Sequence, residues 1–414
     1  PPSGRAYLPS ASYREMEGWA LPPAAVRALE RGRDALAADP EAAERLHGGY
    51  WPSFLARYEE SARMHAKAER LSRLCRAAGD PEPARLAVAR AQCNDAYWHG
   101  VFGGLYLKHL RDAVWASLAE AERILRAGEG LAFEREQDGG TGAILVHSSR
   151  FAARVEPERG GRVVELTDLA MGVNLANVLT RRHESYHRVR EPRAAAPARP
   201  VEASAEVTAG ANGTEDPPPA VSIHETEARL GLEELPPVDA GPRALLLDRV
   251  LAEHVTERAY AAADYEPVWS WEDEPFEVTV ERRMGALAIA LRASGPFRLD
   301  KTLSFHEDGT LEVAYVWDPA AFPPGAHFAP ELSLGVNPGE DPGIRFGPDL
   351  AGVWRHEIRT VSKSESGFEE TYQGLSLTPL WPCAAGSARL VIPAGADRAA
   401  AAPSTPPTPP SPAR

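Results

Sequence analysis

The chain has 414 residues, of which 43% are hydrophobic and 25% charged, and its formal net charge is -14. This composition is typical of globular proteins, and the length suits two or three domains. The negative charge argues against nucleic acid or an anionic membrane as a partner, and no run reaches the roughly 18 apolar residues of a membrane span. The 3 cysteines lack metal-ligand spacing and favour a reducing compartment, so we expect a cytoplasmic protein.

Residues 22–126 have the composition and spacing of amphipathic helices. They are rich in Ala, Leu, Arg and Glu, and their apolar residues recur at three- and four-residue intervals. Pro22 and Pro23 suit the first turn of a helix, and Gly128 suits the end of the last one. The pattern predicts a helical bundle over residues 1–130, with helices near 12–20, 23–38, 51–78, 82–99 and 105–127.

Beyond Asp138-Gly139-Gly140 the pattern changes to alternating, β-branched segments separated by turn residues. Short strands at such spacing are typical of an antiparallel sandwich, which we expect over residues 131–390. The fold class is therefore predicted to be α+β and multidomain, with a helical bundle followed by a large β-sandwich. Strands are expected near residues 143–147, 151–155, 162–166, 276–280, 287–291, 301–305 and 311–316.

Two stretches are predicted to be disordered. Residues 191–220 are rich in Ala, Pro, Glu and Gly and contain almost no large apolar residue, so they cannot bury enough surface to offset the entropy of ordering. We expect them to form an insertion in the β domain. Residues 391–414 end in a Pro-rich segment of extended character, which we expect to be a disordered tail.

The stretch from Ala91 to Tyr106 combines a carboxylate, an imidazole, an indole and two phenols with several glycines. If residues 95–99 end a helix, Asp95, Trp98 and His99 lie three and four positions apart and leave on one face. An indole can stack on the apolar face of a sugar ring while Asp95 and His99 bind its hydroxyls, and Tyr97 is a further candidate contact. The alternative is a turn between two helices in which Tyr97, Trp98 and Phe102 fill the core.

This stretch resembles the last conserved region of the retaining alpha-glucan enzymes of glycoside hydrolase family 57, the alpha-amylases and 4-alpha-glucanotransferases. Segments on both sides of it resemble the same family in the same order, over roughly residues 1–385. The earlier segments resemble the exit from the family's catalytic barrel and the helical region that follows, and the later ones resemble its β domain. They are Tyr7-Leu8-Pro9-Ser10-Ala11-Ser12-Tyr13-Arg14-Glu15-Met16, Trp19-Ala20-Leu21-Pro22, Gly48-Gly49-Tyr50-Trp51, Phe54-Leu55-Ala56-Arg57-Tyr58, Met64-His65, Asn174-Leu175-Ala176-Asn177-Val178-Leu179-Thr180-Arg181-Arg182, Ser222-Ile223-His224-Glu225, Pro330-Glu331-Leu332-Ser333-Leu334 and Tyr372-Gln373-Gly374.

The resemblance implies a glucan-active enzyme whose reacting groups lie elsewhere. In that family an amino-terminal barrel carries the glutamate nucleophile and the aspartate general acid, and no segment here resembles those that bear them. Retaining hydrolysis needs two carboxylates about 5 Å apart, so no catalytic residue is expected in this chain and Asp95 would be a helper. We expect the carboxyl-terminal part of a longer enzyme, or one product of a split gene, that handles an alpha-1,4-glucan or maltooligosaccharide together with a barrel in cis or as a separate chain. The alternatives are a non-catalytic glucan-binding or accessory subunit and a scaffold without sugar affinity.

Other patterns give weaker signals, and no cofactor is expected. His183 and His187, with Glu184 between them, have a spacing that holds a metal on a helix, but the surrounding segment favours a polar loop without metal. The Trp-rich strands favour core packing over a sugar-binding surface. The residues concerned there are Trp269, Trp271, Tyr315 and Trp317, while His224 is expected to be structural and His306, Glu307 and Asp308 to form a solvated turn.

Overall fold

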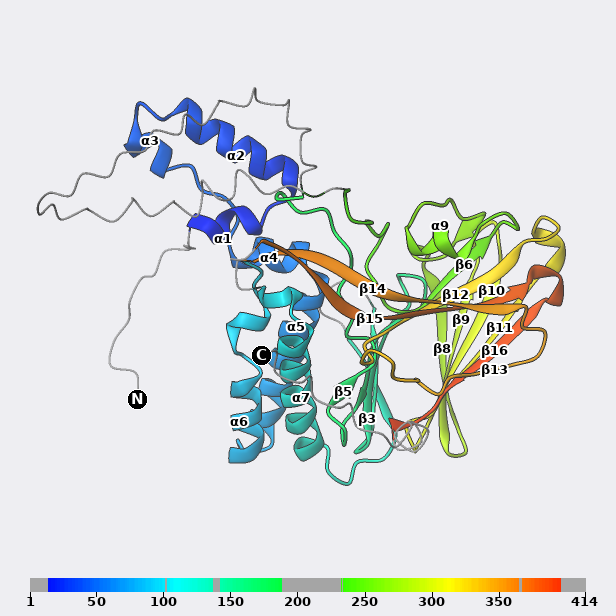
Figure 1. Ribbon diagram of the computed structural model, residues 1–414. Helices are drawn as coiled ribbons and strands as arrows, with labels where there is room; N and C mark the ends of the chain where they lie inside the picture. Colours follow the sequence, from blue (N-terminus) through cyan, green and yellow to red (C-terminus); the bar gives the residue numbers. More distant parts are fainter. Residues whose placement is uncertain are drawn as a thin grey trace, which may run out of the picture.

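The computed structural model describes residues 14–100, 103–136, 142–187, 232, 234–364 and 367–395. The helices of residues 14–125 lie at one side of the molecule and two layers of strands at the other (Figure 1). This arrangement confirms the α+β class predicted from the sequence. The predicted disordered stretch 191–220, the Ser222–Glu225 motif and residues 396–414 of the tail lie outside the described residues. The tail was expected from residue 391, but Val391 and Ile392 still belong to a strand, Ser387–Ile392.

The helices come first along the chain. Prolines at the first positions of α2, α3, α4 and α6 open these helices without the loss of a helical hydrogen bond. No helix in the described ranges is long and apolar enough to cross a membrane. The bounds are α1 Arg14–Trp19, α2 Pro23–Ala35, α3 Pro40–Glu44, α4 Trp51–Arg57, α5 Glu59–Ala77, α6 Glu82–Arg90 and α7 Lys108–Leu125, with short 3-10 helices η1 Asn94–Ala96 and η2 Gly104–Tyr106.

Two of the predicted helices are interrupted. The helix expected at 51–78 is divided at Tyr58, whose extended backbone (φ -112°, ψ 91°) separates α4 from α5. The helix expected at 82–99 ends at Arg90 and is followed by η1, because Cys93 also leaves the helical region (φ -58°, ψ 115°). In both cases the helical spacing of apolar residues continues across a residue whose backbone is not helical. Periodicity alone therefore misses the break.

The strands form two antiparallel sheets. In the larger, 10-stranded sheet the order is β1-β2-β3-β4-β6-β12-β15-β14, with β5 paired to β4 and β7 to β6; in the 6-stranded sheet it is β13-β16-β11-β10-β9-β8. The strands expected from alternation are all present. The bounds are β1 Ala132–Arg135, β2 Ile144–His147, β3 Phe151–Glu156, β4 Arg162–Asp168, β5 Val173–Asn174, β6 Leu245–Leu251, β7 Trp269–Ser270, β8 Phe276–Arg283, β9 Ala286–Ala293, β10 Leu299–His306, β11 Leu311–Trp317, β12 His327–Leu334, β13 Arg345–Phe346, β14 Gly352–Ser364, β15 Gly367–Pro382 and β16 Ser387–Ile392, with a short helix α9 at Glu257–Ala261.

The main hydrophobic core lies between the two sheets. In β10 alternate residues point inward, so Leu299, Leu303 and Phe305 are buried together with Lys301. The larger sheet differs because nearly every residue of β4 and every residue of β6 is buried. One face of that sheet covers the core and the other is covered by helices and connecting segments, which explains the nearly continuous burial.

Buried polar contacts join the helices to the covered face of the larger sheet. The Arg111 side chain in α7 is fully buried and donates hydrogen bonds to Leu105 O, to Asn177 Oδ1 at 3.2 Å and to Gln373 Oε1 of β15 at 2.6 Å. Gln373 in turn donates to Tyr106 O at 2.8 Å. Helix α7 and strand β15 therefore hold the loop around η2 between them.

Candidate functional site

The segment between α6 and α7 contains every residue that the sequence singles out for sugar binding. Since residues 95–99 are not helical, the helical spacing rule does not apply to Asp95, Trp98 and His99, and their expected common face is absent. Asp95 is exposed, Trp98 is half-buried and His99 is 2% exposed. The three side chains thus occupy three different environments although they lie within five consecutive residues.

Glycines let this loop fold tightly against the backbone of Trp98. Gly104 has φ +51°, and a Cβ atom there would lie 2.0 Å from Trp98 O. The same carbonyl oxygen accepts a hydrogen bond from the Leu105 N–H. Gly100 lies against the ring of Trp19, where a Cβ would come within 2.0 Å of the indole. These two positions require glycine for close approach.

Trp98 lines a pocket of about 760 Å³ on the surface of the bundle. Its indole centroid lies 5.1 Å from that of Trp51 and 4.8 Å from the Phe54 ring, both in α4. Trp51 also contacts His65 and Tyr97, with centroid separations of 5.7 Å and 5.9 Å. The aromatic wall faces polar side chains of α5 and of the η1 turn, and the lining includes Glu69, Ser72, Arg73, Arg76, Gln92 and Asn94. A wall of indole beside hydrogen-bonding groups suits a sugar chain.

Tyr97 and Asp95 lie on opposite sides of the same loop. The Tyr97 hydroxyl donates to Ala91 O at 2.9 Å, and its own carbonyl accepts from the Ser61 hydroxyl at 2.8 Å. Burial raises the pKa of Tyr97 above its ordinary value. Tyr97 therefore anchors the loop while its ring forms part of the pocket wall, and Asp95 keeps its carboxylate in solvent.

His99 points inward, toward the carboxylate of Glu184. Its Nε2 lies 4.0 Å from Glu184 Oε2, and neither ring nitrogen has a hydrogen-bond partner among the described residues. Burial lowers the pKa of His99 to about 4, although the charge of Glu184 acts in the opposite direction. The imidazole is therefore neutral at neutral pH, and its contact with Glu184 is not an ion pair there.

The Glu184 carboxylate joins three segments of the chain. Its Oε1 accepts hydrogen bonds from Tyr58 at 2.8 Å and from Tyr106 at 2.7 Å, and its Oε2 accepts from Arg57. Burial alone would raise the pKa of Glu184, but His99 once it is protonated in acid, the Arg57 guanidinium and the hydroxyls of Tyr106 and Tyr58 bring it below its ordinary value. The carboxylate is ionised and holds α4, α5 and η2 against residues 181–187.

The structure gives Glu184 partners that its position between two histidines did not indicate. In the structure His183 and His187 lie with ring centroids 5.8 Å apart, but Glu184 is directed to Tyr58, Tyr106 and Arg57. No group of three His, Cys, Asp or Glu residues within the described ranges is arranged to hold a metal ion. Tyr58 and Trp51 were missed as site residues, although both stand in segments that carry the family resemblance.

The other candidates belong to the β domain. Trp271, Tyr315 and Trp317 are buried in the sandwich core, which confirms core packing for these three, and Trp269 packs against its edge. His306 ends β10 and Asp308 lies in the turn that follows, where its carboxylate accepts from the Thr310 N–H at 2.8 Å.

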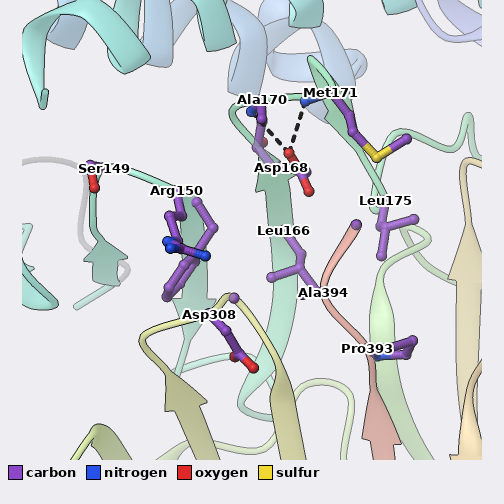
Figure 2. A pocket seen from close by; sticks show the side chains of 14 residues that line it. Ser149, Arg150, Leu166, Asp168, Ala170, Met171, Leu175, Asp308, Pro393 and Ala394 are labelled. Carbon is purple, nitrogen blue, oxygen red and sulfur yellow. Dashed lines mark hydrogen bonds between the residues drawn. The ribbon is translucent and has the colours of Figure 1, made fainter. Parts of the chain in front are cut away.

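A second pocket, of about 290 Å³, lies beside Asp308 at the end of the sandwich. Figure 2 shows Asp168 at its side, where the carboxylate accepts from the Ala170 and Met171 N–H groups at 2.9 Å each. Its aromatic lining consists of Phe151, which is 3% exposed. Because stacking on a sugar needs an accessible ring, the pocket at Trp98 is the better candidate.

Comparison with known proteins places these features in a family. The description "Alpha-amylase/4-alpha-glucanotransferase, middle domain" matches residues 49–125, and "Alpha-amylase/4-alpha-glucanotransferase, C-terminal" matches residues 137–349 and 348–391. The 4-alpha-glucanotransferase of Thermococcus litoralis is 32% identical over 413 residues, covering 92% of this chain and 58% of that protein. The alpha-amylase of Pyrococcus furiosus is 31% identical over 400 residues, covering 91% of this chain and 56% of that protein.

The crystal structure of the 4-alpha-glucanotransferase from Thermococcus litoralis matches the fold as well. The TM-score is 0.68 at 27% identity, and the match covers 93% of this chain and 57% of the other. The chain thus spans somewhat more than half the length of the relatives it matches. The C-terminal description alone matches residues 137–349 and 348–391, which is more than half of the chain. This chain therefore belongs to the alpha-amylase/4-alpha-glucanotransferase family, glycoside hydrolase family 57, and corresponds to the carboxyl-terminal part of its members.

Proposed function

We propose that this chain forms the carboxyl-terminal part of a retaining enzyme acting on alpha-1,4-glucans, an alpha-amylase or a 4-alpha-glucanotransferase. The helical bundle would form one wall of the glucan-binding cleft. The observation that carries this proposal is the aromatic pocket in which Trp98 and Trp51 stand beside hydrogen-bonding side chains of α5. The names of the relatives agree with a substrate of this kind.

Each of the four site residues predicted from the sequence receives a role from its environment. Trp98, half-buried and with part of its ring in the pocket, would stack on a glucose unit. Asp95, exposed on the preceding turn, would accept hydrogen bonds from sugar hydroxyls. His99 is buried and does not line the pocket, so we assign to it the support of this loop in place of the direct contact expected from the sequence. Tyr97 would anchor the loop and form part of the pocket wall.

The chemical step would depend on a catalytic barrel, in cis or as a separate chain. Retention of configuration needs a carboxylate nucleophile and a carboxylic acid about 5 Å apart on either side of the scissile bond. The barrel would supply this pair, and no cofactor is needed. The chain would keep the glucan in register and limit access of water. Hydrolysis or transfer would then depend on whether water or an acceptor sugar reaches the glycosyl intermediate.

Binding of maltohexaose by calorimetry tests the role of the pocket. Stacking on an aromatic ring contributes about 1 kcal/mol, so Trp98→Ala is expected to weaken binding by roughly tenfold for each 1.4 kcal/mol lost. Trp98→Phe should retain part of the affinity. Trp354→Ala is the matched control, because Trp354 is also half-buried but packs against Tyr260 in the β domain. Equal affinity of the Trp98→Ala variant and the wild-type chain would remove the pocket from the proposal.

Activity measurements test the proposed division of labour. Incubation of the 414-residue chain with maltoheptaose should give neither shorter nor longer oligosaccharides on chromatography. Product formation that disappears in an Asp95→Asn variant would contradict the proposal and make Asp95 a catalytic residue.

The cysteines are consistent with a cytoplasmic location for this enzyme. Cys75 and Cys383 are buried and Cys93 is exposed, and all three are free thiols. A reducing compartment would keep the exposed Cys93 from forming mixed disulfides. Localisation of the tagged protein by cell fractionation tests this part of the proposal.

A further inference from the structure

A cavity of about 270 Å³ lies between helix α5 and strands β3 and β4. Glu59, Arg63, Lys67 and Arg70 recur along α5 at intervals of three and four residues, so they share the face of the helix that borders the cavity. The pocket at Trp98 borders other positions of the same helix, such as His65, Glu69 and Arg73. The two pockets therefore share α5 but no lining residue.

The lining of this cavity carries more cations than anions. Five cationic side chains contribute to it, and three carboxylates oppose them. The cations are Arg63, Lys67, Arg70, Arg154 and Arg159, and the carboxylates are Glu59, Glu156 and Glu165.

Arg162 adds a further cation behind this lining. Its guanidinium contacts Glu156 at 2.8 Å and Glu59 at 3.1 Å. Two of the three lining carboxylates are thus shared with an arginine that does not border the cavity.

The lining cations act on the groups beside them, although Glu122 and Glu136 behind the lining pair with Lys67 and Arg154. Burial alone would raise the pKa of Glu156, yet the charges of Arg63, Arg162 and Arg154 hold it below the ordinary value. Burial and the nearby charge of Arg162 also lower the pKa of Arg63. A cation that is destabilised by its neighbours gains from the arrival of an anion.

Arg70 has unused hydrogen-bonding capacity at this cavity. Its Nε is buried and has no acceptor among the described residues, and its nearest carboxylate contact is Glu165 Oε2 at 3.9 Å. Glu165 is itself paired with Lys67, which also contacts Glu122 at 2.5 Å. The Arg70 side chain is 16% exposed, so it can be reached from solvent while much of it is removed from water.

The shape of the cavity separates a mouth from a floor. Arg159 and Glu59 have side chains 31% and 28% exposed, whereas Lys67 and Glu165 are 1% and 4% exposed. A guanidinium fork presents paired N–H donors that match the oxygens of a phosphate, and such charge-assisted hydrogen bonds are strong. We propose that the cavity between α5 and strands β3 and β4 is a binding site for a dianionic phosphate group, free or as a sugar ester, held by Arg70 with Arg63 and Arg159.

Calorimetric titration with inorganic phosphate and with glucose 1-phosphate tests this site. The ionic strength is kept constant with chloride, because salt weakens charge interactions and at 0.1 M largely screens those longer than about 10 Å. We expect saturable binding of a single phosphate group at millimolar concentration or below. The tighter of the two probes identifies the source of the group, and absence of saturable binding for both overturns the proposal.

Substitutions on the two sides of the bundle separate a built site from general surface charge. Arg70→Gln should weaken phosphate binding about tenfold or more, and Arg159→Gln, at the mouth, should weaken it less. Arg85→Gln is the matched control, because Arg85 is exposed on α6 and does not line the cavity. An equal loss in the Arg70→Gln and Arg85→Gln variants, or no loss in either, overturns the proposal.

The result is independent of glucan binding. Maltohexaose should not compete with phosphate, and Trp98→Ala should leave the phosphate titration unchanged, since Trp98 does not line this cavity. Loss of phosphate binding in the Trp98→Ala variant, with the circular dichroism spectrum unchanged, would contradict the placement of the site.

Discussion

His99 gives the chain a defined loss of stability in acid. Burial lowers its pKa from 6.5 to about 4 in the folded state. As the pH falls below 6.5 the unfolded chain takes up this proton first, so the free energy of unfolding decreases until the folded state also binds it near pH 4. Above pH 6.5 the imidazole is neutral in both states and has no effect.

The magnitude follows from the two pKa values. A change from 6.5 to about 4 corresponds to about 3 kcal/mol, of which about 2.5 kcal/mol is already lost at about pH 4.5. Other buried groups titrate over the same range, and His187 and His356 also have pKa values lowered by burial. A comparison of wild type with a variant at residue 99 isolates the contribution of His99.

The variant His99→Leu is suited to this comparison. Neither ring nitrogen makes a hydrogen bond within the described structure, so an apolar side chain of similar size leaves no new unpaired group. Urea denaturation followed by circular dichroism at about pH 7.5 and about pH 4.5 should show a drop in stability smaller by about 2.5 kcal/mol in the variant than in wild type. His254→Leu, at an exposed histidine, is the control and should behave like wild type. Equal drops in His99→Leu and wild type would refute the reasoning.

Two substitutions test other buried features by denaturant and thermal unfolding. Lys301 pairs with Asp248 at 2.8 Å inside the sandwich, and both side chains are 0% exposed. Lys301→Met should therefore cost about 3–5 kcal/mol, because the buried carboxylate loses its cation and keeps only the hydrogen bond from the Tyr315 hydroxyl. Adding Asp248→Leu should restore much of that loss. A single-variant cost near zero would contradict this. Gly104→Ala introduces a Cβ 2.0 Å from Trp98 O at φ +51°, so it should lower both the melting temperature and the affinity for maltohexaose; unchanged values of both would show that the loop is not constrained there.

Strand positions were predictable because their signal is local. In β10 the alternation of Leu299, Leu303 and Phe305 with exposed or half-buried residues indicates one inward face. The same alternation places Lys301 on that inward face, so a buried cation could be predicted from the pattern. Its partner Asp248 could not be read from the sequence, because β6 is buried at every position and shows no alternation.

The prediction of the helices was right in outline, but it was wrong at residues 91–99, which carry the candidate site. Apolar spacing gave α5 and α7, but the expected helix through residue 99 depended on the same spacing across Cys93, whose backbone is not helical. The glycines after His99 indicated that an irregular loop begins there. In the structure the loop begins earlier, at the end of α6. The interpretation of Asp95, Trp98 and His99 as one helical face was lost with that helix.

The contacts that set the orientation of the loop are long-range. Tyr58 and Tyr106 meet Glu184 across 126 and 78 residues of sequence. No periodicity reports such a pairing, and the sequence indicated only a polar loop around Glu184. A carboxylate between two tyrosines and an arginine, however, fixes loop geometry through short charge-assisted hydrogen bonds.

The position of Trp98 in the bundle therefore depends on the β domain. Glu184, from the segment that follows β5, accepts a hydrogen bond from Tyr106 at one end of the loop. Gln373 of β15 accepts a hydrogen bond from the Arg111 guanidinium, which also donates to Leu105 O. Loss of either anchor would loosen the loop that places the Leu105 N–H against the carbonyl of Trp98, while the indole itself also packs on Trp51 and Phe54 of α4. The helices without the strands would lack two of the contacts that orient this loop, which gives a physical reason for the helices and the sheets to fold together.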